Sequence, residues 1–128
     1  PQLGREVLNY GHTFGHAIEK VERFSWRHGA AVAVGMMYVA ELARLSGRLS
    51  ESDVDRHRSV LETVGLPTTY QAGRWEELSA AMLLDKKTRG SLMRFVVLNG
   101  IADPAVLEGP DPALLLAAYD SISQGSAA

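Results

Sequence analysis

Residues 28–46 carry apolar side chains almost without interruption, and this stretch constrains the fold more than any other part of the sequence. Its apolar positions are not confined to one stripe, which predicts a helix that is buried on most of its sides. Such a helix is expected to be the central element of the domain. With 128 residues and 46% hydrophobic content, the chain fits one globular domain with a hydrophobic core.

Further helices and one β-ribbon are predicted around this central helix. Four helices are expected, at residues 6–23, 50–64, 75–87 and 111–123. Ser50 followed by Asp53 is an N-terminal capping signature for the second of them. β-Branched and aromatic residues predict a strand at 92–98, and Asn99-Gly100 is a hairpin turn signal before a strand at 101–107. The expected fold class is therefore mainly α, a multihelical domain with a small two-stranded β-ribbon.

One side of the first predicted helix is polar. Its polar residues are Arg5, Asn9, His12 and His16. Steps of four, three and four residues stack side chains on one helical face, and burying an unpaired polar group costs about 1–3 kcal/mol, so this face is expected to line a polar site. Two imidazoles one turn apart are used to bind zinc, and His28 begins the next helix, where the dipole favours a neutral imidazole. Spacing alone therefore leaves open a metal site of three histidines.

Three glycines and a fourth histidine have competing interpretations. Gly11, Gly15 and Gly35 each cost about 1 kcal/mol relative to alanine inside a helix. They allow close approach of either a ligand or another backbone, and helix packing explains any one of them equally well. His57 lies between two arginines in a polar helix, and it is expected to be a hydrogen-bonded residue with no role in the site.

Charge and composition exclude several classes of function. Thirteen Lys and Arg residues against fifteen Asp and Glu give a net charge of −2 without a basic cluster, which argues against a nucleic acid partner. Residues 29–40 are shorter than the roughly 20 apolar residues that span a bilayer, so no membrane segment is predicted. Without cysteine, a metal must be held by nitrogen and oxygen ligands, and a reducing cytoplasm is compatible. The start at Pro1, without an initiator methionine, suggests a piece of a longer protein.

Three motifs resemble the C-terminal domain of 3-dehydroquinate synthases. They are LNYGHTFGHAIE at residues 8–19, HGAAVAVGM at residues 28–36, and Asp85-Lys86-Lys87. The resemblance follows family order and covers nearly the whole chain, although the last helix matches only in helical character. It implies that residues 1–128 are the helical C-terminal domain of a two-domain enzyme with one α/β and one all-α half. The N-terminal NAD-binding domain is then absent from this chain.

The family resemblance also implies a reaction. Members convert 3-deoxy-D-arabino-heptulosonate 7-phosphate into 3-dehydroquinate and phosphate, which makes them lyases of the shikimate pathway of aromatic amino acid biosynthesis. NAD and a divalent metal, zinc or cobalt, are the implied cofactors, and NAD is bound mainly by the missing domain. The implied partners are the sugar-phosphate substrate, the N-terminal domain and a second copy in a cytoplasmic homodimer. The 128 residues by themselves are expected to be inactive.

Carried over residue by residue, the resemblance replaces the three-histidine site by a different one. His12 and His28 match the family's zinc-binding histidines, and the third ligand is a glutamate upstream of this chain. His16 becomes a substrate contact. The family usually has glutamate at the position of Ala30, so a hydrogen-bonding partner for His28 is expected from elsewhere.

The remaining site residues match contacts to the substrate. Arg5 and Asn9 match two of these contacts, and the planar donor fork of Arg5 suits a carboxylate or a phosphate. Asn9 and His16 are expected to face the phosphate. Either Lys86 or Lys87 matches a lysine that reaches an anionic group of the substrate, and the sequence does not distinguish them. The catalytic candidates are therefore His16, Lys86 and Lys87.

Two other enzyme classes are compatible with parts of this pattern. A related sugar-phosphate cyclase, such as a 2-deoxy-scyllo-inosose synthase, shares the metal and NAD chemistry but takes a hexose phosphate, which lacks the carboxylate that Arg5 suits. A metal-dependent alcohol or glycerol dehydrogenase shares the two-domain plan and the separated histidines, but Asn9 and Asp85-Lys86-Lys87 fit it poorly. Taken by itself, the chain is also compatible with a folded helical domain without activity.

Overall fold

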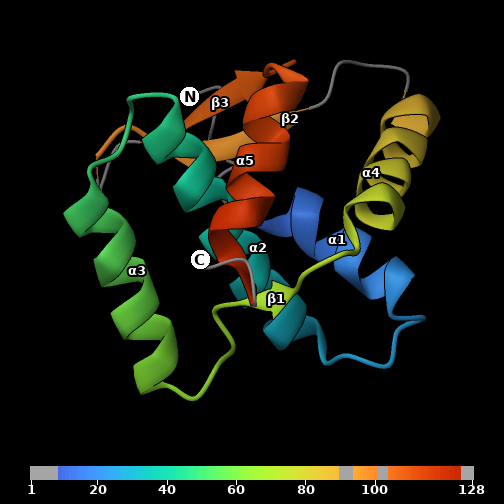
Figure 1. Cartoon of the computed structure of the whole chain (residues 1–128), viewed down its shortest axis with the longest axis horizontal. Helices are drawn as coiled ribbons and strands as arrows, with labels where there is room; N and C mark the ends of the chain where they lie inside the picture. The colour runs from blue at the N-terminus through green and yellow to red at the C-terminus, as the bar shows by residue number, and fades with distance from the viewer. Residues whose placement is uncertain (1–8, 90–93, 101–103, 125–128) are drawn as a thin grey trace.

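A computed structural model describes residues 9–89, 94–100 and 104–124. These residues form five helices and two pairs of short strands, joined by turns and loops (Figure 1). The helices are α1 (His12–Val21), α2 (His28–Leu45), α3 (Glu51–Thr63), α4 (Trp75–Arg89) and α5 (Pro112–Ile122). The strands are β1 (Tyr70–Gln71), β2 (Arg94–Leu98), β3 (Pro104–Glu108) and β4 (Ser123–Gln124). The predicted fold class, mainly α with a small two-stranded ribbon, is confirmed. No helix within the described ranges is both long and apolar enough to cross a lipid bilayer.

Helix α2 is the central element, as the apolar stretch predicts. Twelve of its eighteen residues are buried, and it packs against α1, α3, α5 and β2. In Figure 1, α2 runs behind α5, with α3 and α1 on either side. The ring of Tyr38 stacks on Phe14 of α1 with centroids 3.9 Å apart, and its hydroxyl donates to the carbonyl oxygen of Leu115 in α5 at 2.9 Å. One buried side chain therefore links three helices.

Local capping sets the start of two helices where the sequence predicts it. The side chain of Ser50 accepts a hydrogen bond from the backbone N–H of Asp53 at 3.1 Å, which caps α3. Asp111 caps α5 in a similar way through the N–H of Ala113 at 2.8 Å, with Pro112 at the first helical position. These caps join residues that are close in sequence, so a local pattern is sufficient to locate them.

Helix α1 begins later than predicted. The prediction covers residues 6–23, but the observed helix starts at His12, and Arg5 lies outside the described residues. Gly11 precedes the helix with a φ of +80°, a left-handed conformation, and Asn9 lies in the turn before it. The prediction that Asn9 and His12 share one helical face is therefore wrong, and Gly11 is not in a helix interior.

The backbones of α1 and α2 touch where three glycines meet. We call this contact the glycine seam, and it consists of Gly11, Gly15 and Gly35. A Cβ atom at Gly35 would overlap the carbonyl oxygen of Gly11. A Cβ atom at Gly15 would lie 3.2 Å from the carbonyl oxygen of Ala31 in α2. The seam therefore favours helix packing as the explanation of these glycines over the close approach of a ligand.

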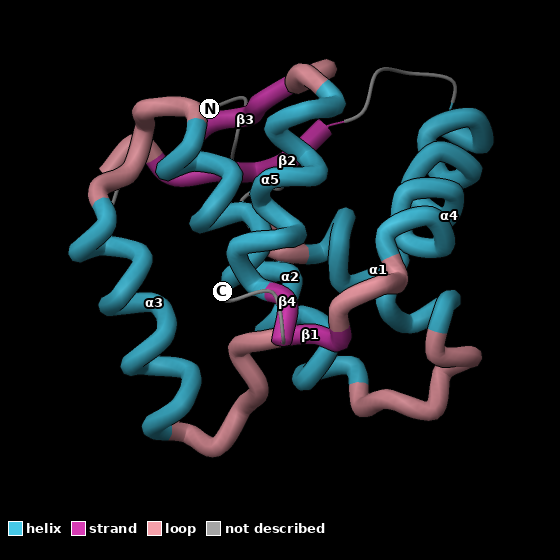
Figure 2. Tube along the Cα trace, viewed as in Figure 1, coloured by secondary structure: helices cyan, strands magenta, loops and turns pink. Residues whose placement is uncertain are grey.

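Strands β2 and β3 form the predicted antiparallel ribbon (Figure 2). Leu98 pairs with Pro104, and the second strand is predicted to begin at residue 101. Residues 101–103 lie outside the described part of the chain. The parallel pair of β1 and β4 is not predicted by the sequence, because two-residue strands from distant segments carry no periodic pattern.

Candidate metal and substrate site

Three histidine side chains come together on α1 and at the start of α2. His12 and His16 lie one turn apart on α1, and His28 is the first residue of α2. The ring centroid of His12 lies 5.4 Å from that of His16 and 5.6 Å from that of His28. The centroids of His16 and His28 are 6.4 Å apart. We call these three residues the histidine face, and the glycine seam holds the two helices that carry it side by side.

His12 has a ring nitrogen that needs a partner. Its Nδ1 atom is buried and has no hydrogen-bond partner in the part of the chain that the structure describes. A buried polar atom without a partner costs about 1–3 kcal/mol, and native proteins contain few of them. Imidazole nitrogen is a common zinc ligand, so a metal ion is a group that would satisfy this atom. The surroundings of His12 therefore fit its predicted role as a metal ligand.

His28 has a carboxylate beside one of its ring nitrogens. Its Nδ1 atom lies 3.0 Å from Oε2 of Glu19, a residue of α1. Because this contact engages Nδ1, the other nitrogen, Nε2, is the one left for a metal. The sequence predicts that a partner for His28 comes from elsewhere than Ala30, and the structure shows that this partner is Glu19.

The separation of His12 and His28 suits two ligands of one metal ion. Zinc binds imidazole nitrogen at about 2.0–2.1 Å in tetrahedral geometry, which places the centroids of two bound rings roughly 5 Å apart. The ring centroids of His12 and His28 are 5.6 Å apart, which is close to this value. The ring of His16 lies at a similar distance from that of His12. Only His28 has a carboxylate, Glu19, on one ring nitrogen, and this contact distinguishes it from His16. Within residues 9–89, 94–100 and 104–124, no three His, Asp or Glu side chains converge to hold a metal ion. The three histidines therefore lie near one another, but among the described residues they do not form a three-ligand metal site.

A small polar recess of about 50 Å³ lies beside His16. Its lining residues are Asn9, His12, Thr13, His16 and Asp85. Burial, helped by the neighbouring His12, lowers the pKa of His16 below its usual value, which favours the neutral imidazole. Asn9 reaches the recess from the turn before α1, although it does not lie on the helix. The recess offers hydrogen-bonding groups of both kinds, donors and acceptors, which suits a polar ligand with hydroxyl or phosphate groups.

The structure does not bring Lys86 into this recess. Lys86 lines a separate cavity of about 360 Å³ with residues that include Trp75 and Leu115. The side chain of Lys87 is not described, so the role given to one of the two lysines stays a prediction. It is the neighbouring Asp85 that reaches the recess from α4.

Two residues of the site have no role in the sequence-based prediction. Glu19 follows His16 by three residues, so it continues the same helical face, and this spacing is a signal from which it could be found. Asp85 is part of a recognised motif, but its approach to the recess depends on the packing of α4 against α1. That contact joins distant segments and has no local pattern.

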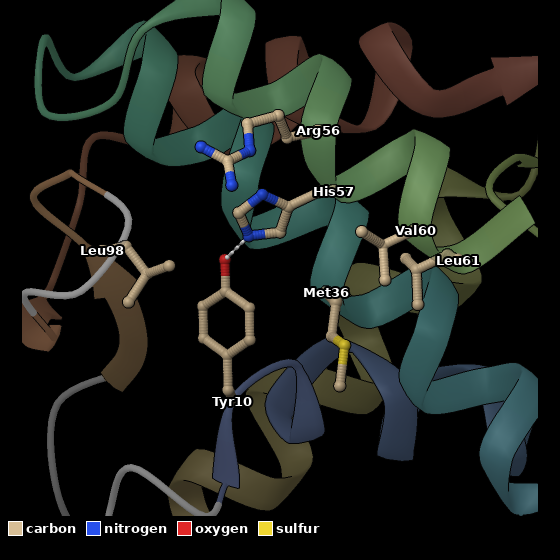
Figure 3. Close-up of a pocket in the computed structure, with 7 residues that line it drawn as sticks. All are labelled: Tyr10, Met36, Arg56, His57, Val60, Leu61 and Leu98. Carbon is tan, nitrogen blue, oxygen red and sulfur yellow. Dashed lines mark hydrogen bonds between the residues drawn. The ribbon is translucent and has the colours of Figure 1, made fainter. Parts of the chain in front are cut away.

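A third cavity, near the start of α1, is mainly apolar (Figure 3). Its volume is about 330 Å³, and its lining includes Met36 and Leu98. Tyr10 and His57 meet there, with the Tyr10 hydroxyl 2.8 Å from Nε2 of His57. Nδ1 of His57 lies 2.8 Å from the carbonyl oxygen of Asp53, so both ring nitrogens are engaged and the predicted hydrogen-bonded state of His57 is confirmed. An apolar lining suits a sugar phosphate poorly, so we assign the candidate site to the histidine face and its recess.

The fold and the site define the class: a mainly helical domain that carries part of a polar, histidine-lined site. The chain belongs to the 3-dehydroquinate synthase C-terminal family, which it matches over residues 2–88. This match contains the whole of α1 and α2 and every residue that we assign to the site. The family resemblance seen in the motifs is therefore confirmed.

Curated relatives share high sequence identity with the chain. A 3-dehydroquinate synthase of Arthrobacter sp. (strain FB24) is 66% identical over 119 residues, which are 93% of this chain and 33% of that protein. A 3-dehydroquinate synthase of Streptomyces coelicolor is 62% identical over 120 residues, which are 94% of this chain and 33% of that protein. The chain thus spans about a third of the length of these relatives.

Solved structures have the same fold. A 2-epi-5-epi-valiolone synthase from Streptomyces hygroscopicus subsp. jinggangensis 5008, with NAD+ and Zn2+ bound, has a TM-score of 0.80 at 24% identity and covers 89% of this chain and 32% of its own. A 2-deoxy-scyllo-inosose synthase, complexed with carbaglucose-6-phosphate, NAD+ and Co2+, has a TM-score of 0.64 at 32% identity and covers 79% of this chain and 29% of its own. Both matches support the mainly helical fold of the described residues.

Proposed function

We propose that this chain is the C-terminal domain of a 3-dehydroquinate synthase. In the full-length protein it follows an N-terminal NAD-binding domain, and the two domains together convert 3-deoxy-D-arabino-heptulosonate 7-phosphate into 3-dehydroquinate and phosphate in the shikimate pathway. The observation that carries the proposal is the 66% identity to a 3-dehydroquinate synthase across 93% of the chain. The buried, unpaired Nδ1 atom of His12 supports a metal site in the same region.

His12 and His28 are the proposed ligands of a zinc or cobalt ion, with a third ligand from the part of the protein that precedes this chain. When bound, the metal supplies Lewis-acid polarisation of a substrate oxygen. His12 offers its unpaired Nδ1, and His28 offers Nε2 because Glu19 engages its Nδ1. The 2-deoxy-scyllo-inosose synthase structure holds NAD+ and Co2+, which supports both proposed cofactors.

Arg5, Asn9 and His16 are the proposed contacts to the substrate. A neutral His16 donates one ring N–H to the phosphate and keeps the other nitrogen free to take up a proton. The amide of Asn9 donates from the same recess. The guanidinium of Arg5 pairs with the substrate carboxylate, and Lys86 or Lys87 pairs with a further anionic group.

The proposal extends to the whole protein. We infer that it is a phosphate-eliminating lyase that binds NAD mainly through its N-terminal domain and acts as a cytoplasmic homodimer. The chain spans about a third of the relatives' length, and two histidines leave a three-ligand metal site incomplete. We therefore expect no turnover from residues 1–128 by themselves.

A related sugar-phosphate cyclase is the second candidate, and one observation favours it. The 2-deoxy-scyllo-inosose synthase that binds carbaglucose-6-phosphate is 32% identical over 79% of the chain. Identity to a 3-dehydroquinate synthase is about twice as high, at 66% over 93% of the chain. Because this identity is higher, we propose the heptulosonate phosphate as the first candidate substrate.

Phosphate release from two substrates distinguishes these candidates. The full-length protein, with NAD and zinc, is given the heptulosonate phosphate and, separately, glucose 6-phosphate. We expect phosphate release from the first substrate, and we expect Arg5→Ala to lower kcat/KM about 100-fold because a charge-assisted contact to the carboxylate is lost. Arg48→Ala, which removes an exposed arginine between α2 and α3, is the matched control and keeps activity. Release from glucose 6-phosphate alone would establish the second candidate, and no release from either would contradict both.

A further inference from the structure

The side chain of Glu19 has one hydrogen-bonding partner among the described residues, and that partner is a proposed metal ligand. Its Oε2 atom lies 3.0 Å from Nδ1 of His28. Only 14% of the Glu19 side chain is exposed, whereas 59% of the His28 side chain is exposed. A carboxylate that is largely withdrawn from water is costly unless a donor compensates it. The ring N–H of His28 is that donor.

The next carboxylate along the chain, Glu22 at the C-terminal cap of α1, is bound by groups outside the histidine face. Glu22 accepts a hydrogen bond from the hydroxyl of Tyr70 and pairs with the guanidinium of Arg74. These contacts tie the end of α1 to the segment before α4. Glu19 also joins two elements, α1 and α2, but its contact goes to a ring nitrogen of the histidine face.

We propose that Glu19 is a positioning residue that accepts the Nδ1 hydrogen of His28 and thereby leaves Nε2 of His28 to a metal shared with His12. The inference rests on the metal site of the proposed function. A carboxylate in this position fixes the tautomer of the imidazole, orients the ring and raises the basicity of its other nitrogen. Replacing such partners commonly lowers metal affinity about 10- to 100-fold.

The zinc affinity of the full-length protein, measured by competition with a chromophoric chelator, tests this proposal. Glu19→Gln keeps an acceptor oxygen but removes the negative charge, and Glu19→Ala removes both. We expect zinc binding to be about 10-fold weaker in the first variant and up to about 100-fold weaker in the second. Glu76→Gln, the same change at an exposed glutamate of α4, is the control and keeps the wild-type affinity. Affinity within about twofold of wild type in both Glu19 variants would overturn the inference.

The tautomer of His28 separates a positioning role from a merely structural one. It is measured by NMR in the metal-free full-length protein with ¹⁵N-labelled histidine, and the His28 signals are assigned by comparison with His28→Gln. We expect the wild type to carry the hydrogen on Nδ1 and Glu19→Ala to shift it towards Nε2. A His28 tautomer that is the same in both proteins would overturn the inference, even where Glu19→Ala lowers the thermal stability.

One more variant separates failure of this inference from failure of the metal site. His12→Ala removes a proposed ligand, and we expect it to abolish tight zinc binding. If His12→Ala weakens zinc binding while neither Glu19 variant does, the metal site stands and the role of Glu19 is wrong. If the wild type binds no zinc, or binds it equally well without His12, both the metal site and the role of Glu19 are wrong.

Discussion

The glycine seam and the histidine face lie on the same two helices, but their contacts are of opposite kinds. At the seam, Gly35 approaches Gly11 so closely that no Cβ atom fits between the backbones. At the face, Nδ1 of His12 has no partner among the described residues, and the His28 ring is largely exposed. At the seam the two helices pack backbone against backbone, and no histidine takes part in that contact. The face is therefore free to keep polar groups that folding does not satisfy.

Gly35→Ala is expected to break the seam and to have the largest effect. The new methyl group would overlap the carbonyl oxygen of Gly11 and lie 2.9 Å from the backbone nitrogen of Gly15. Both neighbours are backbone atoms, so the helices must move apart, and we expect the free energy of unfolding to fall by about 3 kcal/mol or more. Urea denaturation followed by circular dichroism measures this change. Zinc binding is expected to weaken as well, because His12 and His28 separate.

Gly29→Ala is the matched control in the same helix. No atom lies within 4 Å of a Cβ atom at Gly29. We expect stability to stay the same or to rise by up to about 1 kcal/mol, because alanine is the better helix former. Equal stability of the Gly35 and Gly29 variants would show that the seam does not set the distance between α1 and α2.

Tyr10→Phe has a smaller expected effect and tests how the turn before α1 is held. Burial raises the pKa of Tyr10, so its hydroxyl stays protonated and donates to Nε2 of His57. Loss of this hydrogen bond is expected to cost about 1 kcal/mol of stability. Because Tyr10 adjoins Asn9, we also expect a higher KM for the heptulosonate phosphate with little change in kcat. Thermal denaturation and steady-state kinetics check both, and no change in either would show that the seam alone holds this turn.

The pH dependence of stability is the smallest expected effect, and it concerns the histidine face. Burial, with His12 as a second cause, lowers the pKa of His16 in the folded protein from its usual 6.5. The unfolded chain then binds more protons between the lowered value and 6.5, so stability is lost as the pH falls through this window. In metal-free protein, His16→Gln is expected to reduce the loss of stability, measured by urea denaturation, as the pH falls below 6.5. Identical profiles for the wild type and His16→Gln would contradict the environment assigned to His16.

The parts of the fold that the sequence predicts well have local causes. Helix α2 can be predicted from its nearly continuous apolar content. The starts of α3 and α5 can be predicted from the capping residues Ser50 and Asp111. The start of α1 cannot be predicted in this way. Gly11 adopts a positive φ where it meets Gly35 on the next helix, and that contact joins segments with no shared local pattern.

In the site, too, the residues with a local sequence pattern can be predicted, and the contacts between distant segments cannot. The histidines of the face can be found from their spacing and from the family motif, and the structure brings all three together. The contact of Glu19 with His28 and the approach of Asp85 to the recess depend on how α1 crosses α2 and α4. The role of Arg5 stays a prediction, because this residue lies outside the described part of the chain.

The zinc content of the full-length protein tests the central claim most directly, namely that His12 holds the metal and His16 contacts the substrate. Wild type, His12→Ala and His16→Ala are purified in parallel, and zinc and phosphate release from the heptulosonate phosphate are measured with NAD present. We predict that His16→Ala keeps zinc and loses turnover, whereas His12→Ala loses both. Loss of zinc in both variants would contradict the account and would establish a metal site made of three histidines.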